Sequence, residues 1–224
     1  MDTATAPVVR RGSQAKLMFF LFFFATTIFV AYLKNARILD PSSPISQHFA
    51  PAKWYLPVHA FFGILAMAVA AFQFSNRLRA RYLRVHRTLG YVYVTSVFIS
   101  APFAIAVAMK VAAGLSFVAA NIMQSLGWMV TTAIALYCVR NGNIIQHRRW
   151  MIRSYPFAMV FTVVRAIRLL PPIARMGYEG REMVLWSAIA LAAFLPNIFL
   201  EWRTISPRSA ARFVAGARFP HTGT

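Results

Sequence analysis

Six long apolar segments dominate this chain and limit what it can fold into. A helix needs about 20 apolar residues to cross the hydrocarbon core of a bilayer, where its backbone must satisfy its own hydrogen bonds. The six segments comprise residues 17–33, 55–75, 88–109, 115–138, 150–170 and 183–202. The pattern predicts an all-α integral membrane bundle of six transmembrane helices, with a membrane domain at 17–203 and its core at 55–172.

The composition indicates what surrounds this bundle. Charged residues make up 13% of the chain and hydrophobic residues 59%, whereas soluble domains carry about 25% charged residues. The net charge of +19 lies mainly in short loops between the apolar segments. Basic loops of this kind are typical of contact with anionic lipid head groups rather than with nucleic acid. We therefore expect the lipid bilayer as a partner and no nucleic acid.

The two ends of the chain are both basic. Residues 1–16 precede an apolar segment that is too long for a signal peptide and lacks a small-residue cleavage site, so it is predicted to be a retained helix. Residues 204–224 form a second basic segment. Most basic residues fall before the first span, after the second and fourth, and after the sixth. By the positive-inside rule, both termini are predicted to be cytoplasmic.

The centre of the chain lacks acidic residues and holds a single cysteine. No Asp or Glu occurs between Pro41 and Tyr178, so the four central segments hold no carboxylate for a proton relay or a di-metal site. The single Cys138 excludes an intramolecular disulfide and a Cys-based metal cluster. Prolines are expected to keep the loop at 34–54 irregular. Asn121 and Gln124 are interpreted as polar contacts between helices.

Two histidines occupy equivalent positions in what looks like a duplicated hairpin. His86 and His147 each follow a basic loop and each precede an apolar segment. This places them at the same predicted membrane depth on two different helices. Bundle cores build cofactor sites from facing helices, and histidine is a common axial ligand of haem iron. The pattern favours a haem b held between His86 and His147. The alternative is that each histidine contacts lipid phosphate beside its neighbouring arginines.

A third histidine and two glycines extend this hypothesis. Gly63 follows His59 by four residues, as Gly90 follows His86, so each glycine shares a helix face with a histidine. Such bare backbone could accommodate a flat macrocycle. Close helix packing is the alternative for both glycines. For His59 the alternative is a hydrogen bond to a Ser, a Gln or the backbone of a neighbouring helix.

Arg165 and Arg168 are three residues apart and therefore lie on one helix face. Arg165 follows His147 by a distance of about 27 Å along a helix, which places both arginines at the opposite membrane edge. The pair is a candidate anion site, for haem propionates or for an acidic electron donor. Snorkelling of the two side chains to lipid head groups is the alternative.

Three motifs carry a resemblance to a known family. They are LRVHRTLGYVYV at 83–94, QHRRWMIRSY at 146–155 and VRAIRLLP at 164–171. Together with the segment around His59 they resemble the predicted bacterial membrane proteins of the domain-of-unknown-function 2306 family, over about residues 56–172. The resemblance implies a bacterial cytoplasmic membrane location and a fold, and it supplies no established activity.

A looser resemblance is to the six-helix cytochrome b-561-like proteins, which carry electrons across membranes through two haems. In that group, histidine ligands pair between the second and fourth helices and between the third and fifth. His86 and His147 fit the third–fifth pair. The fourth segment, 115–138, has no histidine. The resemblance therefore implies one inner haem at most.

Two functional hypotheses follow. The first is a membrane oxidoreductase component that carries electrons between redox partners through haem b. The second is a cofactor-free membrane protein that acts as an assembly partner or handles small solutes or lipids. Under the second hypothesis, the histidines together with Arg165 and Arg168 bind phosphate head groups or stabilise helix packing.

Overall fold

The computed structural model describes residues 18, 22, 24–29, 32, 40–111 and 114–205, with side chains as far as Trp202. Every regular element in this part of the chain is helical, which confirms the all-α prediction. The elements are α2 (Pro44–Phe49), the 3-10 helix η1 (Ala50–Ala52), α3 (Tyr55–Gln73), α4 (Asn76–Arg81), α5 (Leu83–Lys110), α6 (Leu115–Arg140), α7 (Ile144–Ile167), α8 (Pro171–Arg175) and α9 (Gly177–Ile205).

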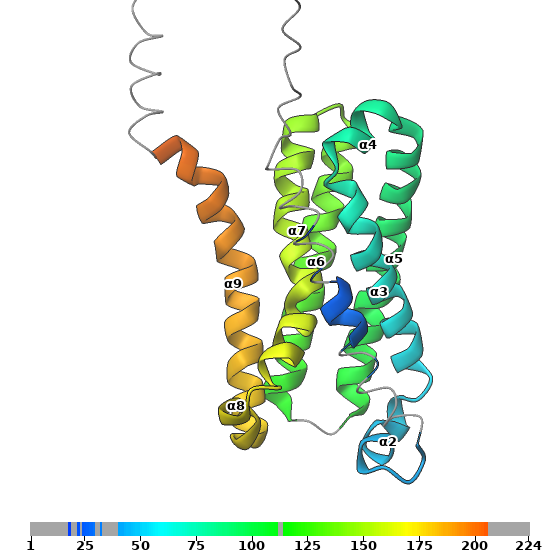
Figure 1. The fold of residues 1–224 in the computed structure, drawn as a ribbon, viewed down its shortest axis with the longest axis vertical. Coiled ribbons are helices and arrows are strands. Elements are labelled where there is room, and N and C mark those ends of the chain that lie inside the picture. The colour runs from blue at the N-terminus through cyan, green and yellow to red at the C-terminus, as the bar shows by residue number, and fades with distance from the viewer. Residues whose placement is uncertain are drawn as a thin grey trace, which may run out of the picture.

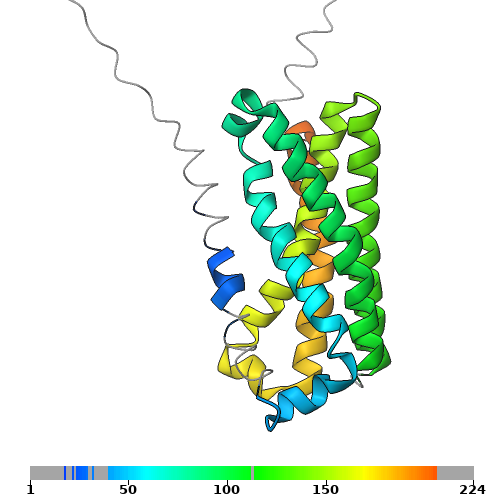
Figure 2. The same cartoon turned by 90° about the vertical axis from the view of Figure 1, so that its right-hand side faces the viewer.

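The long helices lie side by side in one bundle (Figure 1). In this bundle α3 packs on α5, α5 on α6, α6 on α7, and α7 on α9. Helix α4 lies at one end of the bundle, here named the α4 end, and α2 and α8 lie at the other, named the α2 end. The helical residues 24–29 lie beside the bundle (Figure 2). Their Thr27 hydroxyl is 3.0 Å from that of Thr162 on α7 and donates to the sulfur of Met67 on α3.

Four helices, α3, α5, α6 and α9, are long and apolar enough to cross a membrane. Helix α7 runs beside them over 24 residues, but its four arginines make it less apolar. The first predicted span, 17–33, is described only at residues 18, 22, 24–29 and 32. The basic segment 1–16 lies outside the described residues, as does all but the start of 204–224. The count of six spans and the cytoplasmic termini therefore stay predictions.

Several helices begin earlier than the apolar pattern indicates. Helix α7 begins at Ile144 rather than at 150, because the Asn143 side chain accepts a hydrogen bond from the Gln146 N–H (3.1 Å) and caps it. Helix α9 begins at Gly177 rather than at 183. Polar and basic first turns hide these starts from a search for apolar runs.

The prediction of an irregular loop at 34–54 was wrong for residues 44–52. Pro44 occupies the first turn of α2, where its missing N–H costs nothing. The Ser43 hydroxyl accepts a hydrogen bond from the Ser46 N–H (3.1 Å) and caps the same turn. A proline here starts a helix instead of preventing one.

A buried hydrogen-bond network ties three helices together at mid-bundle. The Tyr93 hydroxyl on α5 accepts from the Trp128 indole N–H (3.1 Å) and lies 3.0 Å from the Ser154 hydroxyl on α7. The Thr132 hydroxyl is 2.7 Å from the same Ser154 oxygen. All four side chains are buried. Polar contacts of this kind hold helices together where lipid offers no hydrophobic drive for association.

Candidate functional site

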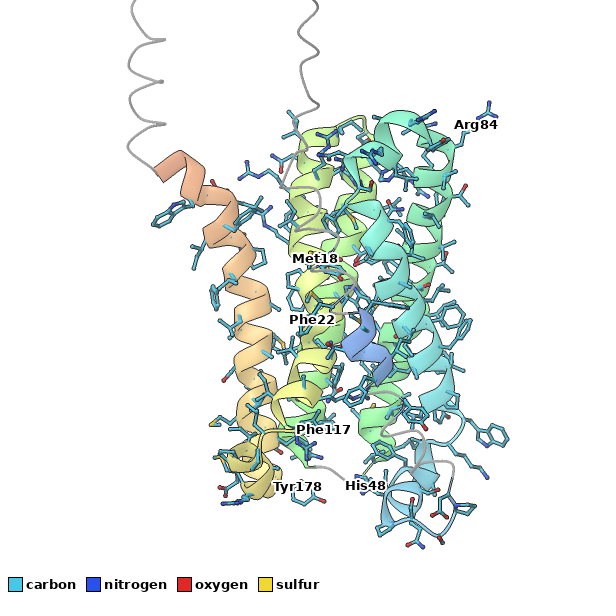
Figure 3. All side chains as sticks on the ribbon, viewed as in Figure 1. Met18, Phe22, His48, Arg84, Phe117 and Tyr178 are labelled. Atoms are coloured by element: carbon cyan, nitrogen blue, oxygen red, sulfur yellow. The ribbon has the colours of Figure 1, made fainter. Side chains whose placement is uncertain are left out.

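A cavity of about 460 Å³ runs through the bundle from the α2 end to Trp128 at the middle of α6. Its walls come from α3, α5, α6, α7 and α9, with His48 of α2 at its edge. Figure 3 shows His48, Phe117 and Tyr178 at this end of the molecule, opposite Arg84. The volume lies within the range of pockets that hold small molecules.

Three arginines line this cavity: Arg165 and Arg168 from α7 and its C-cap, and Arg181 from α9. The Arg181 guanidinium lies over the rings of Phe117 (4.4 Å) and Tyr178 (4.7 Å). Arg168 and the carboxylate of Glu182 are both close enough to act electrostatically on Arg181. Helices α7 and α9 therefore bring a concentration of positive charge to one cavity.

Arg165 has the most unusual surroundings of the three. Its half-buried guanidinium lies 5.9 Å from the centre of the Phe161 ring. Among the described residues, no hydrogen bond or ion pair joins this guanidinium, and the one ion pair present is Arg149–Glu201 at the other end. A charge removed from water without a polar partner is costly, so the cavity is the place where Arg165 can be compensated.

His59 lines the same cavity and links α3 to α5. Its Nδ1 lies 3.0 Å from both the carbonyl oxygen and the hydroxyl of Ser100, and the Ser100 hydroxyl donates to the His59 carbonyl (3.0 Å). Because a carbonyl oxygen only accepts, Nδ1 carries the proton in its bond to it, and Nε2 remains an acceptor in the neutral ring. The contact matches the alternative reading of His59 as a bond to a neighbouring helix.

Helix α6 presents a polar stripe to the cavity, consisting of Asn121, Gln124, Ser125 and Trp128. Their spacing of three, four and seven residues places them on one helix face, and all four are buried. Gln124 Nε2 donates to the Phe157 carbonyl of α7 (3.0 Å), as the prediction of an interhelical contact requires. Asn121 instead donates to the Phe117 carbonyl of its own helix (2.7 Å). The Oε1 of Gln124 is buried, and no hydrogen-bond partner reaches it among the residues that the structure describes.

The two predicted glycines both lie where α3 and α5 approach each other. A Cβ on Gly63 would come 3.3 Å from the Ser100 hydroxyl, and one on Gly90 would come 3.7 Å from Oε1 of Gln73. Gln73 in turn donates to the His86 carbonyl (3.0 Å). These contacts support the helix-packing alternative for the two glycines, although Gly63 also lines the cavity.

His86 and His147 lie at the α4 end, away from the cavity. Each is the fourth residue of its helix, which agrees with the predicted equal depth. The Nδ1 of His147 donates to the Ala135 carbonyl (2.9 Å), whereas the buried Nδ1 of His86 has no hydrogen-bond partner in the described part of the chain. Arg79, His147 and Arg148 all lie close enough to act electrostatically on His86.

The structure thus divides the predicted site residues into two groups. His59, Gly63, Arg165 and Arg168 share the cavity, whereas His86, His147 and Gly90 lie near the opposite end. Within the described residues, no group of three or more His, Cys, Asp or Glu side chains could hold a metal ion. That finding does not bear on a haem held by two histidines, which stays a prediction.

Sequence reasoning missed Arg181 and the binding potential of the α6 stripe. Arg181 lies between the fifth and sixth apolar segments, on the same predicted membrane side as Arg165, and this shared side is the available signal. The stripe was visible as polar residues at helical spacing within an apolar segment. Whether the stripe faces the cavity that Arg165 lines depends on the packing of α6 against α7, which the sequence pattern does not specify.

Comparisons with known proteins bear on the family. A search among curated proteins and a search among solved structures each found no match. The family model described as "Predicted membrane protein (DUF2306)" matches residues 56–205, a range that begins at the second residue of α3 and ends with α9. This match covers more than half of the chain, including every helix that lines the cavity except α2 and the helical residues 24–29. The chain therefore belongs to the DUF2306 family of predicted membrane proteins.

Proposed function

We propose that this membrane protein binds an anion with an apolar body in the cavity at the α2 end. The observation that carries the proposal is Arg165, a half-buried cation on the cavity wall with no hydrogen-bond or ion-pair partner among the described residues. A carboxylate or phosphate on a ligand would supply that partner. Arginine suits this role because its planar fork forms two parallel hydrogen bonds with such groups.

The remaining lining explains the apolar body. The cavity is also lined by small and aliphatic side chains such as Ile64, Ala101, Ala104 and Val107. Burying apolar ligand surface here contributes about 25 cal/mol per Å². The charge of Arg165 binds the anionic head group of the ligand, and the apolar walls of the cavity contact its hydrocarbon chain. This function falls in the class of small-solute or lipid handling.

The proposed setting is the bacterial cytoplasmic membrane, with six spans and both termini in the cytoplasm. The distribution of basic loops supports this orientation by the positive-inside rule. In that orientation the α2 end and its cavity face the outer leaflet. The ligand would then reach Arg165 from the outer side of the membrane or from the outer leaflet.

Binding of decanoate to the full-length protein in lipid nanodiscs tests the proposal by isothermal titration calorimetry. We expect saturable binding of decanoate and much weaker binding of uncharged decanol. Arg165→Gln should weaken decanoate binding at least about tenfold, since a hydrogen bond to a charged group contributes about 1.5–3 kcal/mol.

The matched control is Arg175→Gln, because Arg175 is exposed in α8 at the same end and does not line the cavity. It should leave the affinity unchanged. Equal affinities for decanoate and decanol, or equal losses in the two variants, would contradict the proposal.

A second candidate function, electron transfer through haem b, rests on the ring of His147. Its Nδ1 donates to the Ala135 carbonyl, and a backbone bond of this kind fixes the tautomer that leaves Nε2 free to coordinate a metal. His86 would be the second axial ligand, with its Nδ1 still available for a hydrogen bond. Haem bound between them would supply one-electron chemistry.

Visible spectroscopy of protein purified from haem-replete cells tests this second candidate. Dithionite should produce Soret and alpha bands that disappear in His86→Ala and in His147→Ala. His48→Ala changes a histidine of α2 and serves as the control. A colourless preparation would contradict haem binding and would leave the cavity proposal untouched.

A further inference from the structure

We infer that the ligand of the cavity carries a second polar group, a hydrogen-bond donor such as a hydroxyl, which the α6 stripe receives at the far end from Arg165. This inference rests on the proposed function and specifies its ligand class. The ligand would be a bifunctional amphiphile, with an anionic head, an apolar middle and a donor at the tail.

The unpartnered Oε1 of Gln124 is the first observation. Gln124 is 3% exposed and lines the cavity, and its Nε2 is already held by the Phe157 carbonyl. That bond fixes which end of the amide is oxygen, because two facing oxygens could not form it. The remaining acceptor is buried and unsatisfied. A buried acceptor without a donor costs free energy, so a group that donates to it gains affinity.

The surroundings of Gln124 are the second observation. Asn121, Ser125 and Trp128 share its helix face and line the same cavity. Of these, the Trp128 indole N–H donates to the Tyr93 hydroxyl, and the Asn121 amide donates to a carbonyl of its own helix. Within the described residues, none of the three side chains donates a hydrogen bond to Oε1 of Gln124. A ligand that enters the cavity can bring one.

The helix register sets the separation along the bundle between Gln124 and Arg165. Gln124 is bonded to Phe157, which precedes Arg165 by eight residues on α7. At about 1.5 Å per residue, Gln124, which would accept the ligand's hydrogen bond, lies roughly 12 Å deeper in the bundle than the level of Arg165. An extended ten-carbon chain bridges a gap of this size. ω-Hydroxydecanoate therefore has the right groups at the right separation.

The experiment compares ω-hydroxydecanoate with decanoate on the full-length protein in nanodiscs. The wild type should bind ω-hydroxydecanoate about five- to tenfold more tightly than decanoate, and Gln124→Leu should abolish that preference. Ser125→Ala removes only a hydroxyl from the stripe and should reduce the preference by about two- to threefold. Met123→Leu, at an exposed position of the same helix, should preserve the preference fully.

The outcomes separate this inference from the proposed function. If decanoate binds in an Arg165-dependent way but the hydroxyl brings no gain, the inference is overturned and the proposed function stands. A preference that persists in both Gln124→Leu and Ser125→Ala also overturns the inference. If neither compound binds to the wild type, the proposed function itself fails.

Discussion

The two ends of the bundle both carry arginines, but they hold them differently. At the α4 end, Arg149 pairs with Glu201 and Arg153 donates to Asn197 (2.7 Å). At the α2 end, Arg165 lines a cavity without such a partner in the described part of the chain. Arg149 and Arg153 are half-buried, as Arg165 is, and both have protein partners. Arg165 faces a cavity instead of a protein partner, which points to a ligand rather than to anchoring.

The largest expected effect comes from reversing one charge at each end. Arg165→Glu should weaken decanoate binding about a hundredfold, because a charge-assisted hydrogen bond is lost and a repulsive carboxylate replaces it. Arg84→Glu, at an exposed position of the α4 end, should change the affinity less than twofold. Calorimetry in nanodiscs measures both. Comparable losses in the two variants would show that total charge, not the cavity, attracts the anion.

The next effect concerns the contact that sets α6 against α7 beside the cavity. A Cβ on Gly127 would come 2.7 Å from the Phe157 ring. Gly127→Ala should therefore destabilise the fold by about 1–3 kcal/mol through overpacking. Gly90→Ala, where the Cβ meets only ordinary contacts, should cost far less. Unfolding in mixed micelles followed by circular dichroism compares them, and a Gly127→Ala variant as stable as Gly90→Ala would contradict this α6–α7 register.

A smaller effect is expected in the buried hydrogen-bond network around Tyr93, which lies between the two ends of the bundle. Tyr93→Phe removes the hydroxyl that bonds Trp128 and Ser154. Interhelical hydrogen bonds in membranes contribute about 0.6 kcal/mol each, so the loss should be about 1–2 kcal/mol. The same unfolding assay applies, with Tyr91→Phe at an exposed position as the control. A Tyr93→Phe loss no larger than that of Tyr91→Phe would mean that the network does not join the ends.

The smallest effect concerns an acid near the α2 end. The hydroxyl and the N–H of Ser42 donate to the Asp40 carboxylate (2.6 and 2.9 Å) and lower the pKa of that carboxyl below its ordinary value. A lowered carboxyl pKa stabilises the folded loop above the ordinary pKa, and this contribution disappears as the pH falls through the folded pKa. NMR titration should give a midpoint that rises in Ser42→Ala. An unchanged midpoint would contradict the hydrogen bond from the Ser42 hydroxyl to Asp40.

The sequence predicts the helices well and the cavity poorly, for physical reasons. Helix α6 was expected at 115–138 and ends at Arg140, because lipid-length apolar runs are encoded locally. The partner of His59 is Ser100, 41 residues away, and only the packing of α3 on α5 brings them together. The meeting of Arg165 with Arg181 likewise requires α7 and α9 to be neighbours. The periodicity of apolar residues does not specify which helices pack together.

Diffraction from crystals of the protein grown with ω-bromodecanoate tests the central claim most directly. The anomalous signal of bromine marks the tail, and the electron density marks the carboxylate. Our account predicts a bromine peak deep in the cavity beside Gln124 and Trp128, with the carboxylate on the Arg165 guanidinium. Bromine found only on the lipid-facing surface of the helices, with Arg165 contacting no ligand, would contradict it.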